Sequence, residues 1–395
     1  MTRESHTKPV NFLRGVPADE TLARLAPMVG QGYADAVERH GTDVLQYGHL
    51  GGFAPLREQL AKLHGVDPDR VIVGNGGMEA LSLLFKALPP NSTVIVEEAT
   101  YDRVLRDLER QGHRAVGVAL TAEGIDLEGL SKALDAFPAA VFYGIPYHQN
   151  PTGICYTEEN RREVERLCRA RDVICCWDIC YQPLRYDGIP NAPVEVSEDG
   201  PVLASSFSKT VSPGTKCGYL VLPAPLAKRV VGIAANTRIN PNLPTQAFIA
   251  DFIASGRCDE FASYLKALYR KRMDAMNAAL SDHFPDAATA RITGGFFTGL
   301  HLDAIPSGQA ERFIAFAAES GVGIDAGWGA VAPNFMDEKR GRGLFVRLTF
   351  PAFEPESIHR GIERLREAVR RFPGEGTAAS RTGGSSALPP YRESA

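Results

Sequence analysis

Short apolar runs that end in turn-forming or chemically reactive residues recur along the first half of this chain. They lie at residues 71–74, 93–96, 116–118, 140–143, 173–177 and 202–204. Segments with apolar residues at helical spacing separate them, for example residues 101–110 and 158–171. Continuous apolar runs of this length are typical of strands in a parallel sheet, which needs helical crossovers between its strands. The alternation therefore predicts an α/β fold with a mainly parallel sheet covered by helices on both faces.

The second half of the chain has a different pattern. Residues 261–284 have the spacing of a long amphipathic helix, and strand-like runs follow at 295–302 and 344–349. These segments predict a smaller α+β unit beside the large one. Residues 374–395 are rich in Gly, Ser, Ala and Pro and have little to bury, so we expect a disordered tail. The expected division is an N-terminal arm and part of the small domain at 1–44, a large domain at 45–275, a C-terminal small domain at 276–373 and the tail at 374–395.

Composition narrows the class of protein. The chain has 395 residues and a formal net charge of −4, which leaves no basic surface typical of nucleic-acid binding. No apolar stretch approaches the roughly 20 residues that a membrane-spanning helix needs. The first residues lack the apolar centre of a signal peptide, so we expect a cytoplasmic protein. Seven cysteines show no zinc-ligand spacing, and Cys175 and Cys176 are expected to be reduced core thiols rather than metal ligands.

A lysine in a serine-rich turn follows the run at 202–204. Lys209 is preceded by Ser206 and Ser208, and Lys216 lies a few residues later. A lysine amine forms a Schiff base with an aldehyde, and pyridoxal phosphate is the aldehyde that enzymes commonly hold in this way. The two hydroxyls and the second cation suit the phosphate of that cofactor. Taken alone, a lysine in a loop is more often simply exposed to water.

Other polar groups follow neighbouring strand-like runs. The glycine turn at 76–77 begins a helix, whose first N–H groups suit a phosphate. Asn150 is held by a following proline, and Asp178 lies three residues before Tyr181. A carboxylate beside a pyridinium nitrogen keeps that nitrogen protonated, which makes the ring an electron sink. Each motif has a plain alternative as a turn, a polar loop or a helix cap, but ligands of such sheets bind where the strands end.

The order of these motifs resembles that of the fold-type I enzymes that use pyridoxal phosphate, specifically the class I and II aminotransferases. The order runs from the glycine turn through Tyr101, Asn-Pro-x-Gly, Asp-x-x-Tyr and Ser-x-Ser-Lys to Arg347, across about residues 9–372. Residues 45–57, 149–153 and 294–297 are similar to the branch that includes 2-aminoadipate and kynurenine aminotransferases. The resemblance implies an aspartate aminotransferase-like fold and a homodimer with active sites at the subunit interface.

The resemblance implies a role for each site residue. Lys209 anchors the cofactor and serves as the general base, and Asp178 pairs with the pyridine nitrogen. Asn150 and Tyr181 hydrogen-bond the phenolic oxygen of the cofactor, and Tyr101 stacks on its ring. The substrate carboxylate binds Arg347, with Asn150 beside it. The phosphate is surrounded by Gly76, Gly77, Met78, Ser206, Ser208, Lys216 and, from the neighbouring subunit, Tyr47.

Two departures from the family pattern bear on the site. Lys216 stands where the family usually has arginine, so a point charge replaces a planar fork at the phosphate. The early Gly-Gly-x-Pro of the family appears here with Arg14 before Gly15. Arg14 either binds an acidic substrate side chain or faces solvent. The pKa of Lys209 must fall for its task, and we expect burial and the charge of Lys216 to lower it.

The resemblance implies transfer of an amino group between an L-α-amino acid and a 2-oxo acid with ping-pong kinetics. The same residues would serve an eliminating, replacing or cyclising enzyme, which stays open as the alternative. Sensor halves of transcriptional regulators also share this fold, but they carry a DNA-binding domain ahead of it, and this chain begins almost directly with the fold. The sequence does not name the amino donor. Four aromatic residues are candidates for the pocket but more typical of core: Phe12, Phe296, Phe297 and Trp328.

Overall fold

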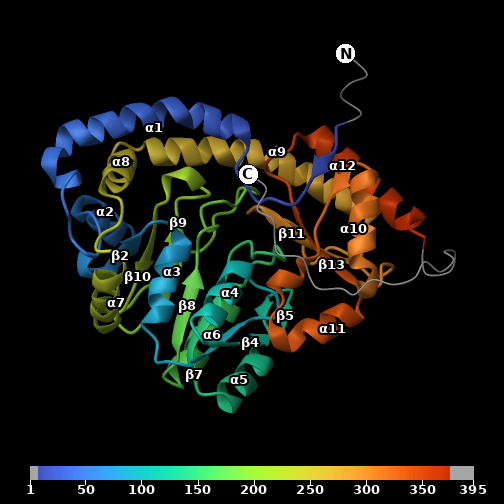
Figure 1. Cartoon of the computed structure of the whole chain (residues 1–395), viewed down its shortest axis with the longest axis horizontal. Helices are drawn as coiled ribbons and strands as arrows, with labels where there is room; N and C mark the ends of the chain where they lie inside the picture. Colours follow the sequence, from blue (N-terminus) through green and yellow to red (C-terminus); the bar gives the residue numbers. More distant parts are fainter. Residues whose placement is uncertain (1–7, 374–395) are drawn as a thin grey trace, which may run out of the picture.

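A seven-stranded sheet forms the centre of the computed structural model, which describes residues 8–373 (Figure 1). Its strand order is β2-β10-β9-β8-β7-β3-β4, and the pairs from β9 to β4 are parallel. The predicted mainly parallel sheet is therefore confirmed. The strands are β2 (Val71–Gly74), β3 (Thr93–Glu97), β4 (Arg114–Val118), β7 (Ala139–Gly144), β8 (Ile174–Asp178), β9 (Val202–Ser206) and β10 (Gly218–Val221).

Strand β10 is the exception to the parallel arrangement. It runs antiparallel to both β2 and β9, which places it between the glycine turn after β2 and the serine-rich turn after β9. The sequence pattern did not predict this strand because no helix separates it from β9. Its insertion brings residues 76–77 next to Gly218, where a Cβ atom would lie only 2.4 Å from the backbone nitrogen of Gly77.

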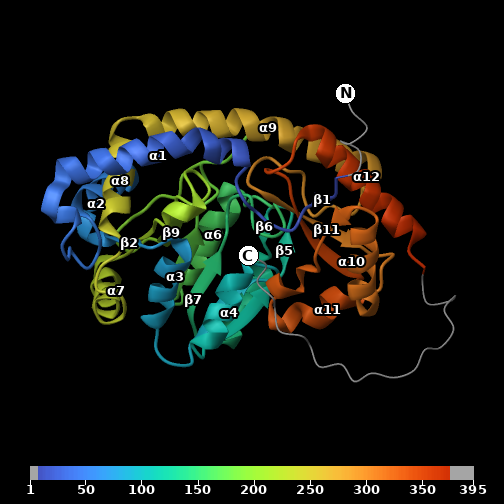
Figure 2. The ribbon, with the colours of Figure 1, turned by 45° about the horizontal axis from the view of Figure 1, so that its top comes forward.

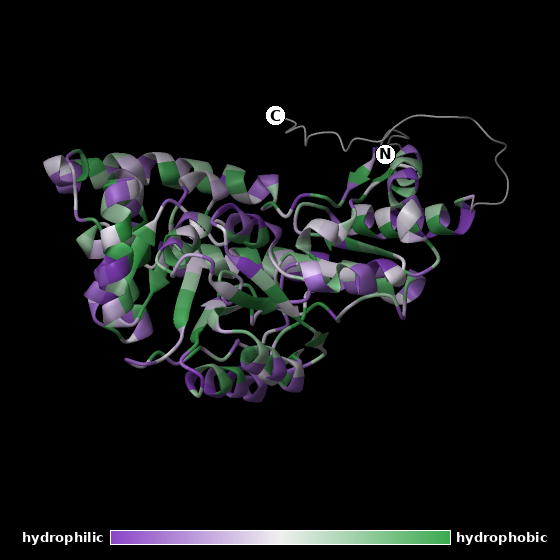
Figure 3. Ribbon diagram, turned by 60° about the horizontal axis from the view of Figure 1, so that its bottom comes forward, coloured by the Kyte–Doolittle hydropathy of each residue, from purple (hydrophilic) through white to green (hydrophobic). Residues whose placement is uncertain are grey.

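Helices cover the sheet, and a side chain caps the start of α5, α6 and α8. The side chain of Asp126 accepts a hydrogen bond from Glu128 N at the start of α5, and Thr157 accepts one from Asn160 N at the start of α6. The sheet strands are mostly apolar, whereas the helices alternate between polar and apolar residues (Figure 3). These helices are α2 (Ala54–His64), α3 (Gly77–Lys86), α4 (Asp102–Arg110), α5 (Leu127–Ala136), α6 (Glu158–Arg169), α7 (Ala224–Thr237) and α8 (Leu243–Ala254).

Two long helices lie together along one side of the molecule. They are α1 (Asp19–His40) and α9 (Arg257–His283), and both views show them side by side (Figures 1 and 2). The buried guanidinium of Arg272 in α9 bonds Glu20 of α1 and, at 2.7 Å, Glu354. The hydroxyl of Tyr269 accepts a hydrogen bond from Ala18 N at 3.2 Å. These contacts fix the segment before α1, which passes over the ends of the sheet strands.

A smaller unit follows α9. Strands β11 (Phe297–Leu302) and β13 (Leu344–Thr349) pair antiparallel, close to the positions predicted from the sequence. The domain boundaries stay a prediction, and the predicted disordered tail lies outside the described residues. Within residues 8–373, no helix is long and apolar enough to cross a membrane. The other elements are β1 (Val10–Asn11) paired with β12 (Val322–Gly323), β5 (Leu120–Thr121) paired with β6 (Gly124–Ile125), α10 (Ala310–Glu319), α11 (Met336–Gly341) and α12 (Pro355–Arg371).

Candidate active site

Lys209 lies three residues beyond β9, in the serine-rich turn. Its Nζ donates a hydrogen bond to the carbonyl oxygen of Gly15 at 2.9 Å and lies 5.3 Å from the ring centroid of Phe296. Burial lowers the pKa of the amine, and the positive charge of Arg347 lowers it further. Asp178 and Cys180 act in the opposite direction. The environment therefore makes the neutral amine more accessible than it is for a lysine in water, and that is the form that acts as a nucleophile or a base.

Lys216 does not have the electrostatic role that the sequence predicts for it. Its side chain is exposed, and its backbone has a left-handed conformation with φ of 49° after the short 3-10 helix Pro213–Thr215. The cation that lowers the pKa of Lys209 is instead Arg347. The sequence suggested Lys216 as this cation because it is close to Lys209 along the chain, whereas Arg347 is distant in sequence and is placed near Lys209 by the fold.

Asp178 is the last residue of β8 and is buried. Its Oδ2 accepts a hydrogen bond from the Tyr143 hydroxyl at 3.0 Å, and its Oδ1 accepts one from Cys180 N at 3.2 Å. Burial raises the pKa of this carboxyl group, and its hydrogen bonds and Lys209 partly offset the rise. A cationic partner would therefore stabilise its ionised form.

Two tyrosines lie near this carboxylate. Tyr101 precedes α4, and burial together with the charges of Asp102 and Asp178 raises its pKa to about 12. Tyr181 is buried, with its ring edge-on to Phe297 at a centroid distance of 6.1 Å. Both phenols therefore stay protonated near neutral pH and are able to donate a hydrogen bond or to contact a planar ring.

Arg347 and Asn150 meet across the border between the large and small sheets. Arg347 lies on β13, and its Nη1 donates to Asn150 Oδ1 at 3.3 Å. Its Nη2 donates to the carbonyl oxygen of Leu13 at 3.2 Å, and its guanidinium lies 4.7 Å from the ring centroid of Phe297. The peptide bond from Asn150 to Pro151 is cis. The guanidinium is only half-buried, so part of its fork is open to a carboxylate.

The two turns beside β10 form a cradle. Gly76 precedes α3 with φ of 103°, and a Cβ atom on Gly77 would lie 3.1 Å from Ser206 Cβ. Met78 follows in the first turn of α3, half-buried. The hydroxyls of Ser206 and Ser208 lie 2.9 Å apart. Helix N–H groups and two hydroxyls in one place suit an anion such as phosphate.

The remaining predicted site residues are more scattered. Tyr47 is 76% exposed and lines a groove of about 530 Å³ formed by residues 44–47 and 238–244, which contains neither Lys209 nor Asp178. Arg14 is exposed. Gly15 contacts Lys209 only through its backbone carbonyl, and a Cβ atom there would lie 2.1 Å from the Phe297 ring. Of the four aromatic pocket candidates, Trp328 is half-buried and the others are core residues.

Sequence reasoning missed three groups at the site. Tyr143 and Cys180 contact Asp178, and the buried Glu97 holds the loop that carries Asn150, because its Oε2 accepts from Gln149 Nε2 at 2.7 Å. Tyr143 and Glu97 each lie at the carboxyl end of a strand, which was the available signal. Together, a buried amine, a buried carboxylate and a phosphate cradle fit pyridoxal phosphate.

Comparisons with known proteins agree with this geometry. An aromatic-amino-acid aminotransferase of Thermococcus litoralis is 27% identical over 380 residues, covering 91% of this chain and 88% of that protein. The crystal structure of the α-aminoadipate aminotransferase of Thermus thermophilus, complexed with N-(5'-phosphopyridoxyl)-L-leucine, has a TM-score of 0.81 at 26% identity and covers 92% of each chain. An uncharacterized HTH-type transcriptional regulator of Bacillus subtilis, YdfD, is 26% identical over 373 residues, covering 92% of this chain and 74% of that protein.

The family assignment is direct. Residues 8–365 match the family described as aminotransferase class I and II. The resemblance drawn from the motifs, the aspartate aminotransferase-like fold and the cofactor are thereby confirmed. The chain belongs to the class I and II aminotransferases and is an enzyme that uses pyridoxal 5'-phosphate to transfer amino groups between amino acids and 2-oxo acids.

Proposed function

We propose that one site, built from Lys209, Asp178, Asn150 and Arg347, carries out this transfer on L-α-amino acids with ping-pong kinetics. The observation that supports it best is the position of Lys209. Its amine donates a hydrogen bond to the carbonyl oxygen of Gly15, and burial and the charge of Arg347 lower the pKa of the amine. That arrangement puts a proton acceptor next to the group expected to bind the substrate carboxylate.

Arg347 would bind the α-carboxylate of the substrate. Its Nη1 already contacts Asn150 Oδ1 and its Nη2 the Leu13 carbonyl, so the plane of the guanidinium is fixed before a substrate arrives. A planar fork binds a carboxylate through two parallel hydrogen bonds, which orients the Cα substituents. With the carboxylate fixed, the Cα–H bond would point towards Lys209.

Pyridoxal phosphate, when bound, supplies an electron-withdrawing ring that makes the Cα–H bond of an attached amino acid acidic. Asp178 would hold the ring nitrogen protonated, while the hydroxyl of Tyr143 keeps the carboxylate oriented. The neutral amine of Lys209 would accept the proton from the substrate Cα. It would then donate that proton to the aldehyde carbon of the cofactor. The Ser206 and Ser208 hydroxyls and the first turn of α3 would bind the phosphate.

A donor screen tests the reaction. Amino acids of the types used by the relatives, aromatic amino acids and α-aminoadipate, are the first donors to add to the holoenzyme. We expect the cofactor spectrum to change to that of its amino form, with one 2-oxo acid released and no ammonia. Release of ammonia without an amino acceptor would instead support the eliminating alternative. The variant Lys209→Ala should show no turnover, and borohydride should fix a phosphopyridoxyl group on Lys209 of the wild type only.

We further propose that the enzyme is a homodimer in which Tyr47 reaches the phosphate of the neighbouring subunit. The supporting observation is that Tyr47, Leu45 and Ile239 are exposed large apolar residues around one groove. Cytoplasmic location also stays a prediction, which cell fractionation would test.

Subunit mixing tests the placement of Tyr47. Lys209→Ala subunits have no base but carry Tyr47, and Tyr47→Ala subunits have the base but lack the phosphate contact. In an equal random mixture about half of the dimers are mixed and each has one complete site, so complete sites amount to about a quarter of the wild-type number, and turnover at limiting cofactor should recover accordingly. No recovery in mixtures shown by mass to contain mixed dimers would contradict a shared site.

A further inference from the structure

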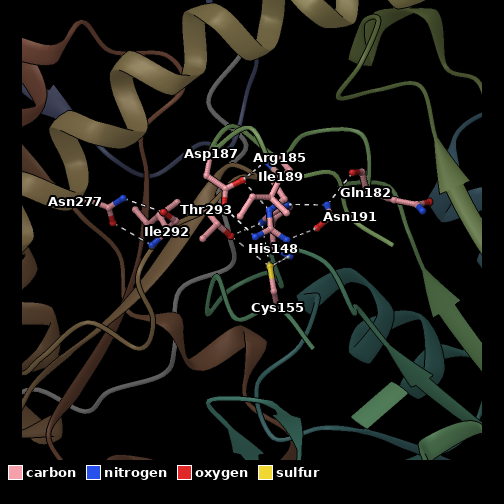
Figure 4. Close-up of polar contacts among 10 residues, drawn as sticks. All are labelled: His148, Cys155, Gln182, Arg185, Asp187, Ile189, Asn191, Asn277, Ile292 and Thr293. Carbon is pink, nitrogen blue, oxygen red and sulfur yellow. Dashed lines mark hydrogen bonds and ion pairs between the residues drawn. The ribbon is translucent and has the colours of Figure 1, made fainter. Parts of the chain in front are cut away.

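A polar cluster around the buried His148 lies beside the Asn150 loop and has no role in the reaction steps described above. We call His148, Cys155, Asn191 and Thr293 the His148 cluster. Figure 4 shows the His148 ring at its centre, with Cys155 and Asn191 on different sides of it. The side chain of His148 is only 1% exposed, and its backbone has φ of 49°. An imidazole in this position must have its ring nitrogens satisfied by the protein.

The orientation of the Asn191 carboxamide is fixed by two neighbours. Its Oδ1 accepts a hydrogen bond from Arg185 Nη1 at 3.2 Å, and a guanidinium can only donate. Its Nδ2 donates to the carbonyl oxygen of Gln182 at 2.9 Å, which can only accept. The second hydrogen of Nδ2 therefore points to His148 Nε2, at 3.1 Å.

This contact fixes the tautomer of His148. Because Nε2 accepts from Asn191, it carries no proton, and the proton of the neutral ring must lie on Nδ1. Nδ1 lies 3.1 Å from Cys155 Sγ and 3.4 Å from Thr293 Oγ1, and both can accept its hydrogen bond. Burial lowers the pKa of His148 to about 3, with Arg185 acting in the same direction and Asp187 against it.

The same geometry excludes a catalytic cysteine. A histidine that activates a thiol needs a lone pair on the nitrogen facing sulfur, and here that nitrogen holds the proton. Cys155 Sγ also accepts a hydrogen bond from His148 N at 3.2 Å, and burial raises the pKa of the thiol. The hydrogen bonds between His148 and Cys155 therefore hold the two ends of the loop at residues 148–155 together, and Cys155 is not an activated nucleophile.

The His148 side chain also fills the space left by two glycines of another segment. A Cβ atom on Gly294 would lie 2.5 Å from His148 Cε1, and one on Gly295 would lie 2.4 Å from His148 Cβ. The next residue, Phe296, lies 5.3 Å from Lys209 Nζ, and Phe297 lies 4.7 Å from the Arg347 guanidinium. On the other side, two residues after His148, Asn150 hydrogen-bonds Arg347. His148 thus belongs to the segment that carries Asn150, and its side chain packs on the segment that carries Phe297.

We propose that His148, as a neutral imidazole with its proton on Nδ1, is a positioning residue that holds Asn150 and Phe297 against Arg347 and so sets the affinity for the substrate carboxylate. The inference rests on the proposed role of Arg347. It assigns to His148 no proton transfer and no contact with substrate.

Substitutions at His148 test the positioning role. In the holoenzyme, His148→Ala should raise KM for both the amino acid and the 2-oxo acid by about tenfold or more, because small displacements of binding groups are costly, and should change kcat much less. His148→Asn should stay within about threefold of wild type, because asparagine tolerates positive φ and offers an N–H near the Nδ1 position. Unchanged KM in a folded His148→Ala variant would overturn the proposal.

His113 provides the matched control. It is also a buried histidine, with Nε2 3.0 Å from the carbonyl oxygen of Phe85, next to β4. The variant His113→Ala should lose stability and keep the KM values of wild type. An equal rise of KM in that variant would show that any buried histidine has the effect, which would overturn the positioning role.

The tautomer has a readout that needs no turnover. In protein labelled with ¹⁵N-histidine, the ring signals that vanish in His148→Asn should show an unprotonated Nε2 and a protonated Nδ1 from pH 6 to pH 8. A proton on Nε2, or an imidazolium forming in that range, would overturn the proposal.

If His148→Ala does not fold, the variants Cys155→Ala and Cys155→Ser replace it. KM should rise in Cys155→Ala and stay near that of wild type in Cys155→Ser, because serine keeps a hydrogen-bond acceptor. Failure of wild type to transfer amino groups would instead count against the proposed function.

Discussion

The Nζ of Lys209 donates its hydrogen bond to the carbonyl oxygen of Gly15, a residue 194 positions earlier in the chain. The segment before α1 thus covers the amine at the end of β9. The same segment supplies the Leu13 carbonyl that accepts from Arg347. The amine of Lys209 and the guanidinium of Arg347 are therefore oriented by backbone oxygens of one short stretch, which is itself fixed by the contacts between α1 and α9.

The first prediction concerns Gly15. In Gly15→Ala the new methyl group would lie 2.1 Å from the Phe297 ring, so this ring must leave its present position, 4.7 Å from the Arg347 guanidinium. We expect KM for both substrates to rise several-fold, with a loss of about 1–3 kcal/mol in the free energy of unfolding. Steady-state kinetics and denaturant unfolding measure the two effects.

Gly30→Ala is the matched control for that variant. Gly30 lies within α1, and a Cβ atom there has nothing within 4 Å. This substitution should increase the free energy of unfolding by roughly 0.5–1 kcal/mol and leave KM unchanged. Wild-type KM in Gly15→Ala would show that the Phe297 ring has no part in binding the substrate carboxylate.

The second prediction concerns Asp178. Asp178→Ala should still bind pyridoxal phosphate, through Lys209 and the phosphate cradle, but should lose at least about a hundredfold in kcat because the ring nitrogen loses its anionic partner. Tyr143→Phe removes the hydrogen bond to Oδ2 and keeps the carboxylate, so a smaller loss of about tenfold is expected. Single-turnover kinetics followed by cofactor absorbance separate these losses from changes in cofactor binding. Near-normal turnover in Asp178→Ala would refute the pyridinium role.

The site residues at or just after the ends of strands could be predicted from the sequence. Asp178 ends an apolar run and Lys209 lies in the turn that follows another, and parallel strands bring their carboxyl ends to one edge. The contacts of Arg347 could not be predicted, because its partners Leu13 and Asn150 lie 334 and 197 residues away in the chain. No local pattern reports such pairs, so Lys216 was the nearer candidate for the cation that lowers the pKa of Lys209.

Strand β10 and Tyr143 were missed for different reasons. β10 follows the serine-rich turn without a helix, so the alternation that predicted the other strands did not include it. Tyr143 lies in a strand whose last four residues are all buried. A strand buried on both faces has no alternation of apolar and polar residues, so its sequence does not mark the tyrosine as different from its neighbours.

The third prediction uses the departure at Lys216. Arginine at this position would offer a planar fork to the cofactor phosphate where lysine offers one exposed ammonium group. Lys216→Arg should therefore lower the Kd for pyridoxal phosphate by about threefold to tenfold, and Lys216→Met should raise it. Lys228→Arg, at an exposed position on α7, is the control. If both Lys216 variants keep the wild-type Kd in titrations of apoenzyme, the phosphate depends on the serines and the first turn of α3 alone.

The last prediction concerns the pH dependence of stability and Glu97. This carboxyl group is fully buried, and burial raises its pKa from 4.5 to about 7, although its oxygens accept from Ile145 N, Gln149 Nε2, Thr100 Oγ1 and the Tyr156 hydroxyl. A pKa raised in the folded state means that the folded protein binds the proton more tightly than the unfolded chain. Its contribution to stability is therefore complete below pH 4.5 and is lost as the pH rises through about 7.

Glu97→Gln cannot titrate, so comparison with wild type isolates this contribution. The free energy of unfolding of wild type, relative to that of Glu97→Gln, should fall by roughly 3 kcal/mol between pH 4.5 and pH 8. Other buried groups such as His148 contribute equally to both proteins and cancel. Glu159→Gln, exposed at the start of α6, should follow wild type at every pH. A difference between wild type and Glu97→Gln that stays constant with pH would show that Glu97 is ionised throughout, held by its four donors despite its burial.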